Sequence, residues 1–382
     1  MPILNLKLDG VLSFNNFETN FSYPSKLQKS VIKNENLTNI PSFRYKKLNI
    51  FMGANASGKT TLVMSIWRIL LFLVKKDPNN IIQLCDKDKD CSKIEIDIAV
   101  DEEDKHELHR FKIMVNNLEE QNISVSHNYV TLSTAKSSKD SYETKKRELD
   151  EMEDNFCDYR EIVNSANFNI GWNLMLPATE QDFNSISLAK CRNDIEEKEY
   201  IRILTYVFET LDNAIVGVKR SQDANNAIVI EHINKGAIII QEGMPLSDIL
   251  YLSSGTKYGI NIANILFNIK FHHNGIYLID EQFSYVNSDV EASLLATMVS
   301  LLGDNEQLFI TTHNAELSSL GFPFHSFYFM KKKIVDGKPE IVVHCGSEAE
   351  NRNNVSPKTI IDNDVFGTAP EVAKIFELGE GE

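Results

Sequence analysis

The sequence of 382 residues predicts an α/β protein with a mixed sheet, an antiparallel β portion and an inserted helical lobe. Three observations predict this fold class. A glycine-rich loop near residue 55 lies between an apolar strand-like run and an apolar helix-like run. A second apolar run ends in two carboxylates near residue 280, and a third ends in Thr-Thr-His near residue 313. Strands that end in polar residues are typical of open α/β sheets, in which ligands bind beyond the carboxyl ends of the strands.

The first elements of this fold come from the N-terminal part of the chain. The apolar runs at residues 3–8, 11–17 and 48–52 are strand-like, and the polar stretch at 25–42 is typical of a loop. The residues that follow the glycine-rich loop, 61–74, predict an apolar helix, and Lys-Lys-Asp-Pro-Asn-Asn then ends it.

The glycine-rich loop, residues 53–61 (hereafter the P-loop), fits the phosphate-binding pattern G-x-x-x-x-G-K-[ST] between a strand and a helix. Its glycines let successive N–H groups turn toward phosphate oxygens, and the helix presents its positive N-terminal end to the same anion. The lysine adds charge at the β- and γ-phosphates, and the hydroxyl of Thr60 is a ligand for Mg²⁺. The predicted nucleotide-binding residues are Gly53, Asn55, Ser57, Gly58, Lys59, Thr60 and Thr61.

The middle of the chain predicts further strands and helices. Residues 94–100 alternate with period two, which indicates a half-buried strand, and 111–115 and 123–132 are its expected antiparallel partners. The very polar residues 134–165 predict a solvated surface helix and not a coiled-coil arm. A further helix is expected over 196–211. Two hairpins are expected, 227–231 with 237–241 and 327–330 with 341–344.

The run Ile-Tyr-Leu-Ile at 276–279 is followed by Asp280 and Glu281. A plain strand with a charged turn would give the same pattern, but the P-loop in the same chain favours a functional role. We expect Asp280 to help hold Mg²⁺, and Glu281 to orient or deprotonate the attacking water.

Two further segments carry candidate site residues. His313 follows the apolar run 308–312, and it is the third polar group at a strand end, so we expect it to hydrogen-bond a γ-phosphate. Ser253, Ser254 and Gly255 open an amphipathic helix and offer another anion-binding N-terminus. Taken alone, this helix start is equally typical of a plain N-cap.

Composition limits the compartment and the partners. The formal charge is −15, which argues against a basic surface over the whole protein, although 145–147 and 331–333 are local basic runs that are more often solvated surface. The five cysteines form no C-x-x-C pair, which favours a reducing compartment. No signal peptide begins the chain, and the apolar run 62–74 is too short to cross a bilayer. A cytoplasmic protein without a membrane partner is expected.

The order of these motifs resembles the ABC-type ATPase family, within its soluble OLD-like and SMC-like group. Residues 252–256 (Leu-Ser-Ser-Gly-Thr) look like the signature motif, Glu281 falls at the catalytic glutamate and His313 at the switch histidine. Asn287 stands where the family has its D-loop aspartate. The resemblance covers about residues 1–75 and 245–320, and Gln181 is the candidate for the Q-loop glutamine.

The resemblance implies an ATPase that forms a homodimer or higher oligomer around ATP and Mg²⁺. Each ATP would lie between Lys59 of one copy and Ser253 and Gly255 of the other. The sequence also resembles stand-alone ATPases of bacterial anti-phage defence. That likeness implies a sensor or regulatory scaffold for a separate effector, a nuclease or a toxin, in antiviral defence.

Two alternatives remain open from the sequence. One is a DNA-repair or chromosome-maintenance ATPase of RecF or SMC type that acts on DNA, and the other is the motor subunit of a transporter. The expected organisation is an N-terminal part of the ATPase core (1–135), an inserted partner lobe (136–245), a second part of the core (246–345) and a tail (346–382).

Overall fold

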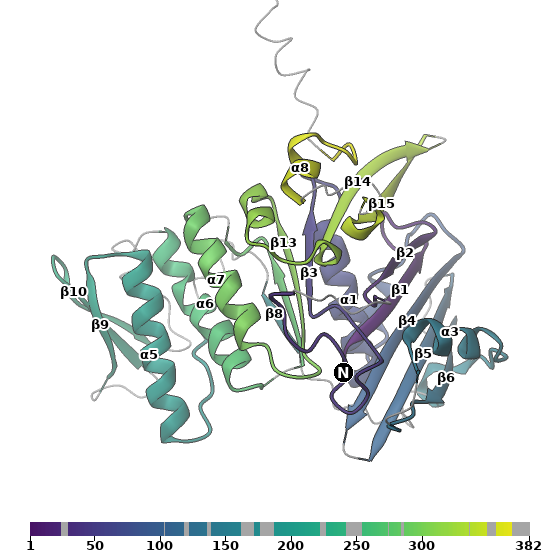
Figure 1. The fold of residues 1–382 in the computed structure, drawn as a ribbon, viewed down its shortest axis with the longest axis horizontal. Helices are drawn as coiled ribbons and strands as arrows, with labels where there is room; N and C mark the ends of the chain where they lie inside the picture. Colours follow the sequence, from purple (N-terminus) through teal and green to yellow (C-terminus); the bar gives the residue numbers. More distant parts are fainter. Residues whose placement is uncertain are drawn as a thin grey trace, which may run out of the picture. The chain divides into compact units, whose positions relative to one another are not determined.

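The structure is a computed structural model, and Figure 1 shows its elements. It describes residues 1–23, 30–102, 104–117, 122–135, 139–161, 172–175, 187–221, 227–241, 254–273, 275–283, 286–335, 337–349 and 357–368. The predicted α/β class is confirmed, with parallel and antiparallel strands. Among the described residues, no helix combines the length and apolar character that a bilayer crossing needs. All five cysteines are free thiols.

The first sheet is antiparallel and has the strand order β2-β1-β4-β5-β6-β7. Its strands are β1 (Ile3–Asp9), β2 (Phe17–Asn20), β4 (Cys91–Glu102), β5 (Lys105–Asn116), β6 (Ile123–Thr131) and β7 (Cys157–Asp158). The predicted pairing of the strands near 94–100, 111–115 and 123–132 is therefore confirmed. The strand predicted at 11–17 is wrong. Val11 and Phe14 bond to each other across a tight turn, with Leu12 at a φ of 50°, so these apolar residues are buried by a turn.

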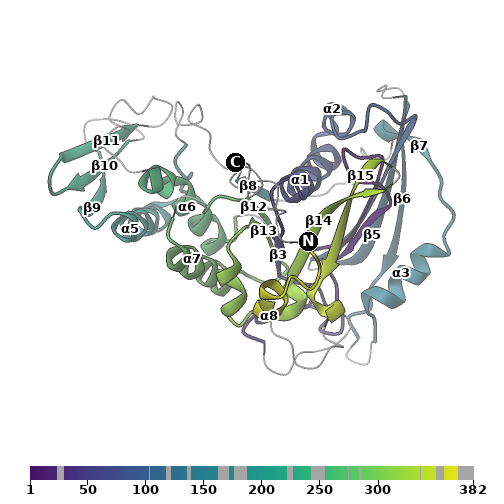
Figure 2. The ribbon, with the colours of Figure 1, turned by 90° about the horizontal axis from the view of Figure 1, so that it is seen from above.

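Helix α3 (Tyr142–Asp150) lies on one face of this sheet (Figure 2). Ser141 and Thr144 form a capping box at its start, and the helix buries Tyr142 and Leu149. The polar stretch 134–165 thus contains a shorter and better anchored helix than predicted. Residues 96–101 of β4 are buried on both faces and are not half-buried, and α3 covers the second face at Asp97, which accepts a hydrogen bond from Tyr142.

An ion-pair network ties α3 to the sheet. Arg110 on β5 donates two hydrogen bonds to Asp97 on β4, both of 2.8 Å, and a third to Asp150 of α3. Burial lowers the pKa of Arg110, but the hydrogen bonds with Asp97 outweigh this, and the net pKa is raised. The arginine side chain therefore stays charged and fixes the helix to the sheet.

The second sheet carries the predicted site and has the strand order β15-β14-β3-β13-β12-β8. Its strands are β3 (Leu48–Met52), β8 (Trp172–Met175), β12 (Ile276–Asp280), β13 (Gln307–Thr312), β14 (Phe327–Val335) and β15 (Lys338–Cys345). Strands β13 and β14 both run parallel to β3, and β14 forms the predicted hairpin with β15. Helix α1 (Lys59–Lys75) follows β3, as the sequence predicts.

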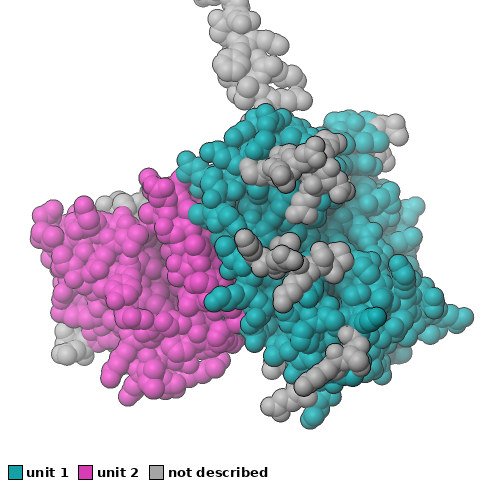
Figure 3. Space-filling view, viewed as in Figure 1, with its two compact units in different colours: residues 1–170, 275–278, 304–382 teal, residues 171–274, 279–303 magenta. Residues whose placement is uncertain are grey.

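The described chain forms two compact units (Figure 3). The first comprises residues 1–170, 275–278 and 304–382, and the second comprises 171–274 and 279–303. These units divide the chain at other residues than the boundaries expected from the sequence. Helix α3 (Tyr142–Asp150) belongs to the first unit, and the helices at 254–270 and 288–301 belong to the second.

Three helices and a small sheet make up most of the described part of the second unit. Helices α5 (Asp194–Leu211), α6 (Ser254–Lys270) and α7 (Ser288–Leu301) pack in that order. The antiparallel sheet has the order β11-β10-β9, with β9 (Ile215–Arg220), β10 (Ala227–His232) and β11 (Gly236–Gln241). The predicted helix 196–211 and the hairpin around Gly236 are confirmed.

The remaining short helices of the described chain belong to the first unit. They are α2 (Asn79–Ile82), η4 (Ala315–Ser319), η5 (Phe324–Ser326), η6 (Gly346–Ala349) and α8 (Pro357–Asp362).

Candidate nucleotide site

The P-loop leaves the end of β3 and turns sharply into α1. Its φ angles are 154° at Gly53, 61° at Ala56 and 96° at Gly58, all in the region that disfavours side chains. A Cβ on Gly53 would lie 2.2 Å from the carbonyl oxygen of Met330, and a Cβ on Gly58 would lie 2.3 Å from Cδ1 of Ile341. Backbone conformation therefore favours glycine at both positions, and at Gly53 the close approach of the Met330 backbone requires it as well.

Charge at the start of α1 is arranged for an anion. Gly58 is the N-cap and offers no side-chain cap, and no acidic residue stands in the first turn of this described helix. The positive end of the helix dipole thus carries no protein carboxylate of its own. Lys59 is 3% exposed, and its Nζ donates hydrogen bonds to the carbonyl oxygens of Gly53 at 2.9 Å and Ala54 at 3.1 Å.

The hydroxyl of Ser57 supports the same interpretation. Ser57 is 2% exposed, and within the described chain its Oγ has no hydrogen-bond partner. A buried hydroxyl without a partner costs free energy that a ligand oxygen beside it would recover. Asn55 and Thr60 are exposed and Thr61 is half-buried, so the rest of the loop faces solvent. These residues fit a phosphate group.

A cavity of about 620 Å³ lies against the P-loop within the first unit. It brings together Gly53, Asn55 and Ser57 with His313, which directly follows β13. Because β3 and β13 are parallel neighbours, the residues after their carboxyl ends meet at one edge of the sheet. The cavity is lined by Met52, Gly53, Ala54, Asn55, Ser57, Thr312, His313, Ala315, Phe329, Lys331, Lys332, Ile361, Asp364, Gly367 and Thr368.

Several of these lining residues were not predicted as site residues. Lys331 and Lys332 were noticed only as part of a basic surface run, although their hairpin continues the strand beside β3. Asp364, Gly367 and Thr368 belong to no motif. No sequence signal short of the three-dimensional fold places these residues beside the P-loop.

Asp280 and Glu281 belong to the second unit, whereas the P-loop and His313 belong to the first. Asp280 is the last residue of β12, and its side chain is fully buried. Glu281 follows with a φ of 46°, which is costly for a residue with a side chain. Strain of this kind persists where the surrounding structure holds it, and it clusters at functional sites. Next to it, Gln282 is 1% exposed, and within the described chain neither of its amide atoms has a hydrogen-bond partner.

The predicted signature segment is described in part. Ser253 lies outside the described residues, as does Gln181, the Q-loop guess. Ser254 and Gly255 are the first residues of α6, so the predicted helix start is confirmed for the backbone. Asn287, at the D-loop position, caps α7: its Oδ1 accepts a hydrogen bond of 2.8 Å from the N–H of Asp289.

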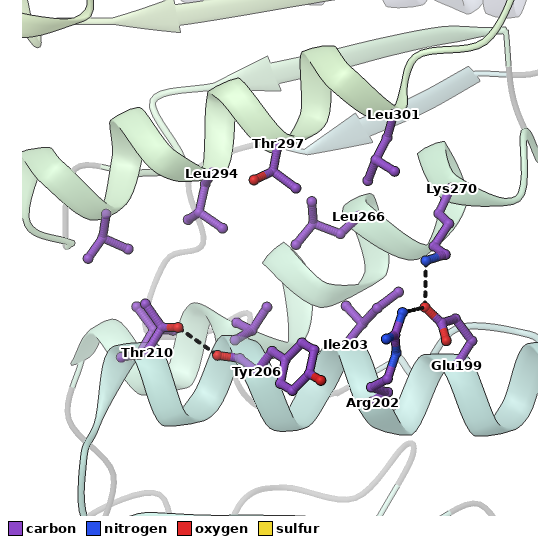
Figure 4. Close-up of a pocket in the computed structure, with 13 residues that line it drawn as sticks. Glu199, Arg202, Ile203, Tyr206, Thr210, Leu266, Lys270, Leu294, Thr297 and Leu301 are labelled. Carbon is purple, nitrogen blue, oxygen red and sulfur yellow. Dashed lines mark hydrogen bonds and ion pairs between the residues drawn. The ribbon is translucent and has the colours of Figure 1, made fainter.

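A more apolar cavity of about 310 Å³ lies in the second unit between α5, α6 and α7 (Figure 4). Figure 4 shows Ile203, Leu266 and Leu294 around it, and a cluster of charged side chains at its edge. There Glu199 accepts a hydrogen bond from Arg202 and forms an ion pair of 2.6 Å with Lys270. None of the predicted site residues lines this cavity, and its carboxylate is already paired, so we do not assign the nucleotide to it.

Comparisons with known proteins give a structural likeness only. No protein-family model matches the chain, and no curated protein matches it in sequence. An SMC head solved with the C-winged helix domain of ScpA has 15% identity and a TM-score of 0.52, over 92% of this chain and 100% of the other. An SMC head domain with an extended coiled coil, bound to the C-terminal domain of ScpA from Pyrococcus furiosus, has 12% identity and a TM-score of 0.50. That match covers 91% of this chain and 98% of the other.

The chain therefore has the fold of an SMC head domain over almost its whole length. This fold agrees with the ABC-ATPase class that the sequence resembles. The long arms of SMC proteins have no counterpart among the described helices, because the longest, α5, has 18 residues.

Proposed function

We propose that this protein binds and hydrolyses ATP on the P-loop. The observation that carries the proposal is the cavity beside the loop, which is lined by His313 and by Ser57 with its buried, unpartnered hydroxyl, two residues before α1 begins. The SMC-head fold supports it, since it is the fold expected for these motifs.

Each predicted residue then has a defined task. The loop N–H groups and Lys59 hold the β- and γ-phosphates, and His313 donates a hydrogen bond to the γ-phosphate. Glu281 orients a water molecule and accepts its proton as the water oxygen bonds to the γ-phosphorus. The bond from that phosphorus to the bridging oxygen breaks, and ADP and phosphate are the products.

Thr60 and Asp280 are the residues that would hold Mg²⁺. A hydroxyl and a carboxylate oxygen suit this ion, which takes its other ligands from phosphate and water. When bound, Mg²⁺ neutralises charge on the β- and γ-phosphate oxygens. The described chain holds no cluster of three or more His, Cys, Asp or Glu side chains for a metal ion. Because phosphate oxygens supply part of its coordination shell, we expect Mg²⁺ to bind together with the nucleotide.

We further propose that ATP joins two copies of the chain, with Ser253, Ser254 and Gly255 of one copy closing over the phosphates held by the other. Hydrolysis then opens the assembly, so the output is a change of conformation. A separate effector, a nuclease or a toxin of antiviral defence, would receive this signal. The sequence resemblance is the support for this role.

The proposal is tested with full-length protein carrying Lys59→Ala, with Lys75→Ala at the other end of α1 as the matched control. Binding of a fluorescent ATP analogue and phosphate release should disappear in Lys59→Ala and remain in the control. Equal ATPase activity in the two variants would refute the assignment.

A second candidate function, action on DNA, is favoured by one observation. Lys332 and Lys333 are exposed on β14, in a protein that is acidic as a whole. If duplex DNA binds there, it should stimulate the ATPase with a steep dependence on salt. Lys332→Ala combined with Lys333→Ala should reduce both the stimulation and the salt slope. An ATPase rate that DNA does not change would leave the effector role as the better proposal.

A further inference from the structure

Residues 357–368, which we call the C-terminal strap, contact the P-loop directly. The strap begins with α8, which packs against η4, the short helix just after His313. Its Ile360 is 2% exposed. At its other end, the carbonyl oxygen of Thr368 accepts a hydrogen bond of 3.2 Å from the backbone N–H of Ala54. The strap therefore connects the two loops that border the cavity beside the P-loop, which we call the phosphate cavity.

Aromatic and charged contacts hold the strap in place. The ring of Phe366 stacks on Phe329 at 5.1 Å and on His344 at 4.9 Å between ring centroids. Lys331 donates a hydrogen bond of 2.6 Å from Nζ to the carbonyl oxygen of Phe366. All these partners lie on the β14–β15 hairpin, so the hairpin serves as the base on which the strap is mounted.

The turn that follows Phe366 aims Thr368 at the P-loop. Gly367 has a φ of 63°, and the carboxylate of Asp364 accepts a hydrogen bond from the N–H of Thr368. Asp364, Gly367 and Thr368 all line the phosphate cavity. The strap thus forms one wall of the cavity and also holds the first turn of the loop.

We propose that the strap is part of the nucleotide site, with Phe366 and Lys331 as positioning residues that preorganise the P-loop for phosphate. This inference rests on the proposed ATP binding. The strap bonds to the second residue of the loop, whereas α1 begins at Lys59. The bond from the strap therefore supports the first residues of the P-loop and does not cap helix α1. Holding a loop in its bound conformation lowers the entropy that binding must otherwise overcome.

Asp364 offers a test that separates a role in the nucleotide site from plain packing. Its carboxylate lines the cavity, so its negative charge opposes a bound triphosphate. Asp364→Asn keeps an oxygen that can accept from Thr368 and removes the charge. This variant should bind the nucleotide more tightly, whereas loss of the strap should weaken binding.

The test uses the full chain with Phe366→Ala and Lys331→Met. The matched controls are Val365→Ala, beside Phe366 and 38% exposed, and Lys333→Met, exposed on the same strand as Lys331. Affinity for a fluorescent ATP analogue should fall about fivefold to tenfold in the strap variants, from the loss of one stacked aromatic or hydrogen bond. The controls should bind like the wild type.

Hydrogen exchange without nucleotide supplies the second measurement. Peptides that cover residues 53–61 should exchange faster in the strap variants and at the wild-type rate in the controls. If Lys331 acted only through its charge, Lys331→Met would weaken binding without faster exchange of residues 53–61. That result would contradict its role as a positioning residue. If Phe366→Ala fails to fold, Phe366→Leu and Lys331→Met carry the test.

The two proposals fail in different ways. If the wild type binds ATP and the strap variants match it in affinity and in loop exchange, the strap is mere packing and the inference is wrong. If the wild type and Lys59→Ala bind equally little ATP, the proposed function fails, and the inference that rests on it fails too.

Discussion

The ammonium group of Lys59 donates a hydrogen bond of 2.9 Å to the carbonyl oxygen of Gly53, so the two ends of the P-loop hold each other. A phosphate that enters the loop offers this lysine a charged acceptor, which makes a stronger hydrogen bond than a neutral carbonyl. Binding should therefore exchange one partner of Lys59 for another without unfolding the loop.

Nucleotide should stabilise the fold through this exchange. ATP at about a hundred times its dissociation constant should raise the free energy of unfolding by about 2.7 kcal/mol. Differential scanning fluorimetry would show this as a higher melting temperature. Lys59→Met should melt at the same temperature with and without ATP, and a shift as large as that of the wild type would contradict the role of the lysine.

Gly58→Ala should damage the loop for two separable reasons. The new methyl group would meet Cδ1 of Ile341 at 2.3 Å, and the φ of 96° would strain any side chain by about 1–3 kcal/mol. The double variant Gly58→Ala with Ile341→Ala removes the clash and keeps the strain. ATP affinity should therefore recover only in part, as measured by titration. Full recovery would show that backbone conformation at residue 58 does not matter.

Glu281→Gln should bind ATP and fail to hydrolyse it, because the amide cannot accept the proton of the attacking water. With ATP and Mg²⁺ the variant should accumulate as a closed dimer or larger assembly in sedimentation velocity. Glu316→Gln, an exposed glutamate in η4, is the matched control and should turn over normally. A Glu281→Gln variant that stays monomeric at micromolar concentration with ATP bound would rule out the sandwich.

Arg110→Met should destabilise the first unit by about 3–5 kcal/mol, because Asp97 would remain buried without its ion-pair partner. Chemical denaturation would measure the loss, and α3 should become more accessible to protease. Arg147→Met, on the exposed side of α3, should change stability by less than about 0.5 kcal/mol. Similar losses for the two variants would mean that the network does not anchor the helix.

Acid should weaken the fold through two stacked histidines. Burial lowers the pKa values of His109 and His127 to about 4, and their nearest ring nitrogens lie 2.9 Å apart. Unfolded histidine takes up its proton near pH 6.5, so the unfolded state binds more protons between pH 6.5 and 4. Stability is therefore complete above pH 6.5 and falls as the pH drops toward 4.

His127→Phe should roughly halve the dependence of unfolding free energy on pH in this window, since one of the two titrating groups is gone. Tyr129→Phe, a ring neighbour that is half exposed, should leave the dependence unchanged. Denaturant titrations at several pH values would measure both slopes. An unchanged slope in His127→Phe would assign the acid sensitivity to other groups.

The elements that the sequence predicted correctly are those with strong local patterns. The buried run of β3, the apolar run of α1 and the spacing of α5 each carry their signal within a few residues. The strand expected at 11–17 failed because Val11 and Phe14 are buried by a turn, which leaves the same apolar composition as a strand. The double burial of β4 could not be predicted either, because it depends on α3, whose buried side chains are only Tyr142 and Leu149.

The candidate site shows the same division. Ser57 and His313 are candidates from the sequence because they stand in a motif or at a strand end, and the structure places both beside one cavity. Thr368 was not found, because its contact is made by a backbone carbonyl oxygen that any residue would supply. No choice of side chain could have marked that position.

The bond between Ala54 and Thr368 also has a consequence for biosynthesis. The ribosome adds Thr368 on the order of 300 residues after Ala54. At about 5–20 residues per second, this is roughly 15–60 s later. A nascent chain therefore exposes its P-loop for most of its synthesis without the wall that completes the cavity. If the strap strengthens nucleotide binding as we propose, a chain that has not yet reached Thr368 should hold ATP more weakly and should join an ATP-driven assembly less readily.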